Sequence, residues 1–124
     1  MGRRYDHPNA IVRRYASARG VATANGTNAP LMVPGKSKLI AVHAHVAVAG
    51  TNVANHAYTI RNGTTSIGAI APGTSAVGAI LVSTVNTVLA ANAILNCLKG
   101  TDATGIVDFT YEYEVLPDAV LTGD

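Results

Sequence analysis

The sequence is poor in large aromatic side chains and in charge. Among its 124 residues there are five Tyr, one Phe and no Trp. Charged residues make up 13% of the chain, which is about half of the usual share of ~25%. Hydrophobic residues still make up 48%, so composition excludes an intrinsically disordered chain. The length predicts one domain built around a single two-layer core.

Cysteine and long apolar runs are scarce as well. Cys97 is the only cysteine, which excludes an intrachain disulfide and predicts a buried, inert thiol. The apolar runs are broken by Gly, Asn and His well before the ~18 residues of a membrane span. No apolar stretch follows the N-terminal Arg pairs, so a signal peptide is not expected. We therefore expect synthesis in a reducing compartment and no membrane partner.

Small and β-branched side chains are abundant, with 21 Ala and 14 Val. Val and Thr favour strands, because their branched side chains fit a pleated surface. From Lys36 onward the hydrophobic pattern has a period of two, which predicts a long strand. Its expected inner face holds Ile40, Val42, Ala44, Val46 and Val48, and its outer face holds Leu39, Ala41, His43, His45 and Ala47.

The clearest strand is expected over residues 106–115. There Val107, Phe109, Tyr111, Tyr113 and Val115 point one way, and Asp108, Thr110, Glu112 and Glu114 point the other. Asn62-Gly63 predicts a hairpin turn. Residues 85–98 are compatible with two short strands, with one bent strand or with a helix. Seven or eight strands with Gly-rich turns predict an all-β, jelly-roll-like antiparallel β-sandwich.

Charge is distributed unevenly along the chain. Residues 1–38 hold seven of the nine basic residues, residues 39–98 hold Arg61 alone, and residues 99–124 hold six of the seven acids. A free monomer usually intersperses charges over its surface. The charge-poor middle therefore predicts a surface that is covered in a homo-oligomer.

The polar, Pro-containing N-terminal region predicts an extended arm. The expected organisation is an arm over residues 1–34, a β-sandwich body over 35–117 and a tail over 118–124, with a short helix possible near residues 8–18. Arg-Arg-Tyr occurs twice in the arm. Docking on an acidic protein surface is the favoured role, ahead of a solvated arm or a nucleic-acid contact. The predicted contact residues are Arg3, Arg4, Tyr5, Arg13, Arg14, Tyr15 and Arg19.

Three histidines are weak candidates for a metal site. In a jelly roll the long strand would lie beside the final strand, which predicts that His43 and His45 are close to Glu112 and Glu114. With His56 they could bind zinc or nickel. A polar strand face is the simpler interpretation, and alternating acids on one strand are more often solvated than catalytic. We expect no catalytic residue, no metal and no cofactor.

The segments VPGKSKLIAV and GIVDFTYEYE, with charge-poor Ala/Thr/Gly-rich strands between them, give a resemblance over residues 20–116. The chain resembles the head decoration (cement) proteins of tailed bacteriophages. This resemblance implies a jelly-roll homotrimer that sits on the outer surface of the capsid. It also implies that the chain has no catalytic residues. It would be made in the host cytoplasm and would bind the major capsid protein through its arm.

Two other functions stay open. One is a phage fibre-like or carbohydrate-binding β-sandwich, although there are few aromatic residues for a sugar platform and Tyr58 is the main candidate. The other is a cupin-like metal enzyme that uses the three histidines.

Overall fold

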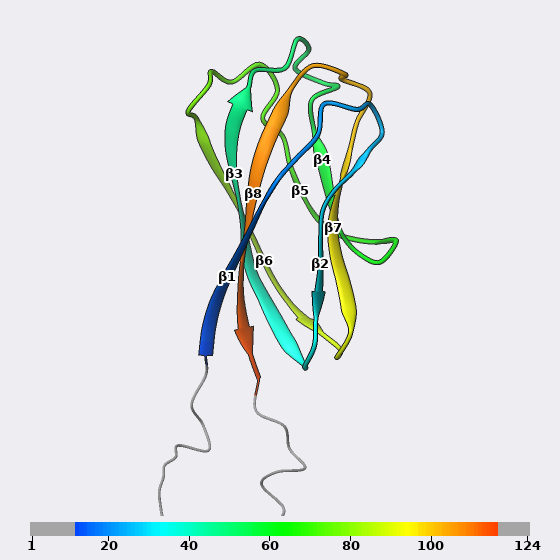
Figure 1. Ribbon diagram of the computed structural model, residues 1–124, viewed down its shortest axis with the longest axis vertical. Helices are drawn as coiled ribbons and strands as arrows, with labels where there is room; N and C mark the ends of the chain where they lie inside the picture. Colours follow the sequence, from blue (N-terminus) through cyan, green and yellow to red (C-terminus); the bar gives the residue numbers. More distant parts are fainter. Residues whose placement is uncertain (1–11, 117–124) are drawn as a thin grey trace, which may run out of the picture.

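The computed structural model describes residues 12–116, which form eight β-strands and no helix. The strands are β1 (Val12–Arg19), β2 (Thr27–Val33), β3 (Ser37–Val48), β4 (Tyr58–Asn62), β5 (Thr65–Ile70), β6 (Ile80–Leu89), β7 (Ala93–Lys99) and β8 (Ile106–Val115). They build a first sheet, β1-β8-β3-β6, and a second sheet, β2-β7-β4-β5 (Figure 1). This order is that of an eight-stranded jelly roll, so the predicted fold class is confirmed.

The long strand β3 lies at the centre of the first sheet, between β8 and β6. Its pairing with β8 confirms that the predicted long strand and the final strand are neighbours. β1 begins and β8 ends at the same end of the sandwich, because Val12 pairs with Val115 (Figure 1). The loops before β4, before β6 and before β8 lie at the opposite end, which we call the loop end.

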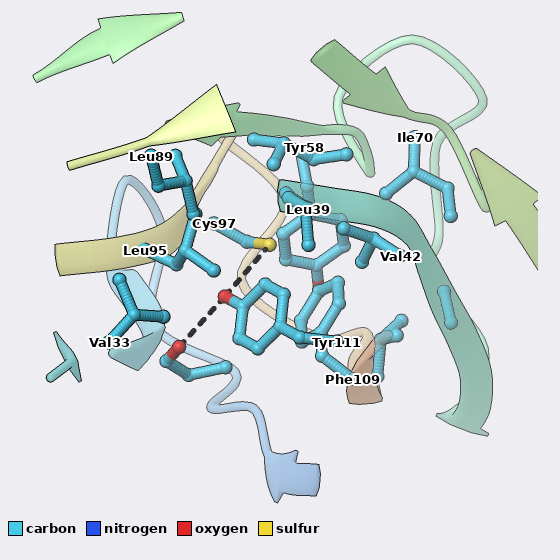
Figure 2. Packing of buried hydrophobic residues seen from close by; sticks show 14 of the residues in the cluster. Val33, Leu39, Val42, Tyr58, Ile70, Leu89, Leu95, Cys97, Phe109 and Tyr111 are labelled. Atoms are coloured by element: carbon cyan, nitrogen blue, oxygen red, sulfur yellow. Dashed lines mark hydrogen bonds between the residues drawn. The ribbon is translucent and has the colours of Figure 1, made fainter. Parts of the chain in front are cut away.

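The core fills the space between the two sheets (Figure 2). Its largest fully buried apolar side chains come from strands of both sheets: Tyr58, Tyr111, Phe109, Leu39, Ile60, Leu89 and Leu95. The rings of Tyr58 and Phe109 meet edge to face, with centroids 4.8 Å apart. Such aromatic pairs add about 0.5–1.5 kcal/mol beyond the area that they bury. The six aromatic residues are few, but three of them, Tyr58, Phe109 and Tyr111, lie in the core.

Alternation along β8 agrees with its prediction, and alternation along β3 agrees only in part. Val107, Phe109 and Tyr111 are buried in the core. On β3, the expected inner residue Ile40 is outside the core, whereas Leu39 is fully buried. The reason is a β-bulge between Leu39 and Ala41, which shifts the register against both neighbouring strands. A single extra residue moves every following side chain to the other face.

The turns between strands resolve two further expectations. The hairpin near Asn62-Gly63 is confirmed, with Gly63 at a φ of 62° between β4 and β5. Such a φ is left-handed and favours glycine. Residues 85–98 contain the end of β6 and most of β7 rather than a helix. The turn between them has Asn92 at a φ of 67°.

The predicted arm over residues 1–34 does not match the strands. Residues 12–19 are β1 and residues 27–33 are β2, so the sandwich already begins at Val12, and the helix proposed near residues 8–18 is a strand from Val12 onward. β2 tolerates Pro30 because it is an edge strand, and a register shift next to Ala29 interrupts its pairing with β7. Residues 1–11 and the tail over 118–124 lie outside the described residues.

Candidate interaction surface

Most of the polar residues that the sequence singled out lie on the outer face of the first sheet. Successive residues of a strand face opposite sides, so each strand contributes one row of side chains to this face. From one edge to the other the rows are Arg13, Tyr15, Ser17 and Arg19 on β1; Asp108, Thr110, Glu112 and Glu114 on β8; Lys38, His43 and His45 on β3; and Ile80, Val82, Thr84 and Val88 on β6. The face therefore runs from basic through acidic and basic rows to an apolar row.

The arginines of β1 bind carboxylates of the same chain. Arg13 donates to Glu112 and, at 2.6 Å, to Glu114. Arg19 makes a two-pronged contact with Asp108, at 2.8 and 3.0 Å. These hydrogen bonds raise the pKa of both guanidinium groups. The acidic surface that was expected on a partner is therefore found, for these two residues, on β8.

The other predicted arm residues have different positions. Arg14 is exposed and lies in register with Tyr113, on the opposite face of β1 from Arg13, so alternation separates the arginine pair. Tyr15 is exposed on the outer face. Arg3, Arg4 and Tyr5 lie outside the described residues.

His43 and His45 lie beside acids, as expected, but with one change of partner. His43 donates from Nε2 to Glu112 at 3.0 Å. His45 is opposite Asp108, with Nδ1 3.9 Å from a carboxylate oxygen. Glu114 instead binds Arg13. The hydrogen bonds from His43 and then Arg13 lower the pKa of the Glu112 carboxyl.

His56 does not join the other two histidines. It is fully buried at the loop end, whereas His43 and His45 lie on the outer face of β3. Its Nδ1–H donates to the Gly73 carbonyl at 2.8 Å, and its Nε2 accepts from the Tyr58 hydroxyl at 3.0 Å. In residues 12–116 no group of three His, Cys, Asp or Glu side chains is arranged to hold a metal ion. The three histidines that were considered as weak metal candidates are therefore not brought together.

A buried ion pair at the loop end was not anticipated from the sequence. Lys99 and Asp102 are buried, with Nζ 3.6 Å from Oδ1. Lys99 also donates to the carbonyls of Ala22, at 2.8 Å, and Gly105, at 2.6 Å. The pair thereby joins the loop before β2 to the loop before β8. No periodic signal marks it, because both residues lie at or after the end of a strand.

Backbone N–H groups surround the Asp102 carboxylate. It accepts from Thr51 at 2.9 Å, Thr104 at 2.8 Å and Gly105 at 2.6 Å. Burial alone would raise the pKa of Asp102, but these hydrogen bonds outweigh burial and hold it well below its usual range. The loops at this end are therefore fixed by a charged, water-excluded anchor.

Cys97 and Tyr58 lie in the core. The Cys97 thiol is 3.5 Å from the hydroxyl of Tyr111, which donates to the Ala29 carbonyl at 2.8 Å (Figure 2). Burial raises the pKa of Cys97 to about 11, so the thiol is protonated at neutral pH and is no nucleophile. Tyr58 is buried as well and cannot serve as the sugar platform considered above.

The apolar row of β6 is the part of the outer face that the sequence did not reveal. Ile80, Val82 and Val88 are 68%, 56% and 53% exposed. Val77, in the loop that leads into β6, is 66% exposed. We call Val77, Ile80 and Val82 the β6 patch. The sequence of β6 has apolar residues on both faces of the strand, so it does not show which face is turned to the core.

A shallow groove of about 470 Å³ crosses the same face. Its lining includes Tyr15 of β1, His43 and His45 of β3 and Ile80 of β6, with Thr110 and Asp108 of β8 between them. The polar groups of its floor bind one another, for example Ser17 and Thr110 at 2.8 Å. The arrangement offers a contact surface rather than a set of free reactive groups.

Comparison with solved structures shows a likeness in fold. A chain of the cyanophage Pam1 capsid asymmetric unit is similar, with a TM-score of 0.60 and 12% sequence identity. The likeness covers 93% of this chain and 91% of that chain, and at this identity it concerns the fold. No protein-family model matches the sequence, and no curated protein matches it. Residues 12–116 contain no helix of the length and hydropathy that crossing a membrane requires.

Proposed function

We propose that this chain is a non-enzymatic structural protein of a bacteriophage particle and that it decorates and stabilises the capsid. The observation that carries the proposal is the shared fold, since the jelly roll aligns with a phage capsid chain over 93% of this chain and 91% of that chain. The mutual pairing of the polar groups on the outer face also favours contact over catalysis.

Within this proposal the chain acts as a homotrimer on the outer surface of the virion, bound to the major capsid protein. The charge-poor segment over residues 39–98 and the exposed β6 patch support self-association. Several copies held together would bind a capsid more firmly than one, because each further contact forms at a high effective concentration.

The first test is the composition of particles. Particles would be purified on a density gradient from cells whose genome encodes the chain, and the chain would be quantified against the major capsid protein by mass spectrometry. We expect co-migration with particles at a fixed ratio, and particles without the chain should rupture at a lower temperature. Recovery of the chain only in the soluble fraction would contradict the proposal.

The capsid contact is proposed for the N-terminal residues Arg3, Arg4 and Tyr5, extended by Arg14 and Tyr15 on β1. Arg13 and Arg19 no longer belong to this set, because they bind carboxylates on β8. The Arg3→Glu/Arg4→Glu variant should lose binding to undecorated particles in a co-sedimentation assay. The Lys36→Glu variant, which reverses a charge outside this set, should bind as the wild type does. If the Arg3→Glu/Arg4→Glu variant bound particles as well as the Lys36→Glu variant does, the N-terminal residues would not be the capsid contact.

A further inference from the structure

The edges of the two sheets differ in how they are protected from other chains. An edge strand exposes unpaired N–H and C=O groups and is blunted in most proteins by charge, Pro, short length or a bulge. β1 carries Arg13, Arg14 and Arg19. β2 carries Pro30 and a register shift, and β5 has six residues with Gly68 among them.

β6 has none of these features in its first half. It is ten residues long and contains no charged residue, Pro or Gly. Its only irregularity is a register shift after Thr84, next to Asn86, which has a φ of 53°. β5 approaches β6 beyond that point, since a Cβ at Gly68 would lie 3.4 Å from Val85. Since β6 pairs with β3 alone within residues 12–116, its other edge is unpaired over Ile80–Thr84, beside the β6 patch.

We propose that the β6 patch, together with the open edge at Ile80–Thr84, is the surface through which copies of this chain bind one another. The absence of charge selects a second copy as the occupant. Residues 71–89, which contain the patch and all of β6, hold no charged residue, so two copies can meet there without like-charge repulsion. Arg61, the one charged residue of the charge-poor segment, lies on the second sheet, where it donates to Asn96 at 2.7 Å.

The ends of the same chain are poorly placed to cover the patch. Val12 pairs with Val115, Val115 with Ser37, and Ser37 with Leu89. The first and last strands therefore begin and end at the level of Leu89, at the opposite end of β6 from Ile80. Two strands, β8 and β3, also separate β1 from β6.

The inference rests on the proposed self-association, and it can be tested without a capsid. Light scattering of the purified chain should give an oligomer, and the Ile80→Lys/Val82→Lys variant should give the monomer mass of 12.7 kDa. The matched control is Ile94→Lys, because Ile94 is an exposed apolar residue (48%) on the outer face of the second sheet. The control should keep the oligomer. Far-UV circular dichroism establishes that each variant is folded.

A second measurement covers the case in which the lysine variant fails to fold. Val82→Cys and Ile94→Cys would each be treated with a short bis-maleimide cross-linker, with Cys97 silent because it is fully buried and protonated. We expect cross-linked species from Val82→Cys only. A monomeric wild type, or equal cross-linking of both variants, would overturn the inference. An oligomer that is absent from particles would leave it intact and contradict the proposed function instead.

Discussion

The loop end and the β1–β8 pair are both held by ion pairs, but they differ in their access to water. Lys99 and Asp102 are fully enclosed, and apart from each other and the Thr51 hydroxyl they bind backbone groups. Arg13 and Arg19 bind their acids at the exposed edge of a sheet, where water and salt screen the attraction. Loss of an ion pair should therefore lower the unfolding free energy strongly at the loop end and only slightly at the β1–β8 pair.

The largest effect is expected from Asp102→Ala. The substitution leaves the Lys99 cation and three backbone N–H groups buried without their partner, which should cost about 3–5 kcal/mol of unfolding free energy. Urea unfolding followed by circular dichroism measures it. The comparison variant is Asp108→Ala, which removes a partly exposed carboxylate that binds the exposed Arg19 and should cost far less. Equal losses would contradict the distinction between the two regions.

A double variant tests whether the buried charge itself causes the loss. Lys99→Met in the Asp102→Ala background removes the uncompensated cation and should recover part of the unfolding free energy. No recovery would mean that the N–H groups around Asp102 account for the whole effect.

Acid should expose the same difference. Asp102 and Glu112 have lowered pKa values in the folded chain, so their stabilisation is complete above the ordinary values of 3.8 and 4.5 and is lost as the pH falls through the folded values. Stability should therefore decline below about pH 5. The decline should be much flatter in Asp102→Asn than in Glu112→Gln, as urea midpoints over a pH series can measure. If stability became independent of pH only in Glu112→Gln, then Glu112 rather than Asp102 would be the main cause of the acid sensitivity.

An intermediate effect is expected in the core, where Tyr111 combines apolar packing with one polar contact. Tyr111→Phe keeps the ring but leaves the buried Ala29 carbonyl without its donor at 2.8 Å. The expected loss is about 1–3 kcal/mol, and it can be measured by thermal unfolding. Tyr113→Phe is the control, because Tyr113 is only partly buried against the core. A larger loss in the control would contradict this role of the Tyr111 hydroxyl.

The smallest effect is expected from Arg13→Gln. The residue is exposed, so its removal should change the unfolding midpoint only slightly at low salt and not measurably at high salt. Amide hydrogen exchange of β1 should nevertheless become faster, since Arg13 holds that edge strand to β8. Exchange as slow as in the wild type would show that the backbone ladder alone retains β1.

Much of the fold could be predicted from period-two patterns. β8 was assigned correctly because its apolar and acidic residues alternate without interruption. β3 was assigned with a wrong inner residue, Ile40, because sequence gives no sign of the bulge beside it. β1 was taken for part of an arm, because the N-terminal region is polar and contains Pro, and its pairing with β8 has no signal in the sequence.

The interaction surface was only partly predictable. His43 beside Glu112 followed from strand order alone. The Lys99–Asp102 anchor did not, because loop residues have no periodic pattern and their partners are brought together only by the closed sandwich. Ile80 and Val82 are exposed because Leu81 lies on the core side of β6. Three consecutive apolar residues do not reveal which of them faces the core.

The pairing of Val12 with Val115 also has a mechanical consequence. A force that pulls the two chain ends apart acts across the open end of the β1–β8 ladder, so it loads the hydrogen bonds one pair after another. Such a geometry peels apart at low force, whereas a load applied along the strands would be shared by many bonds at once. The domain should therefore yield to a force between its two chain ends and resist a force applied along its strands.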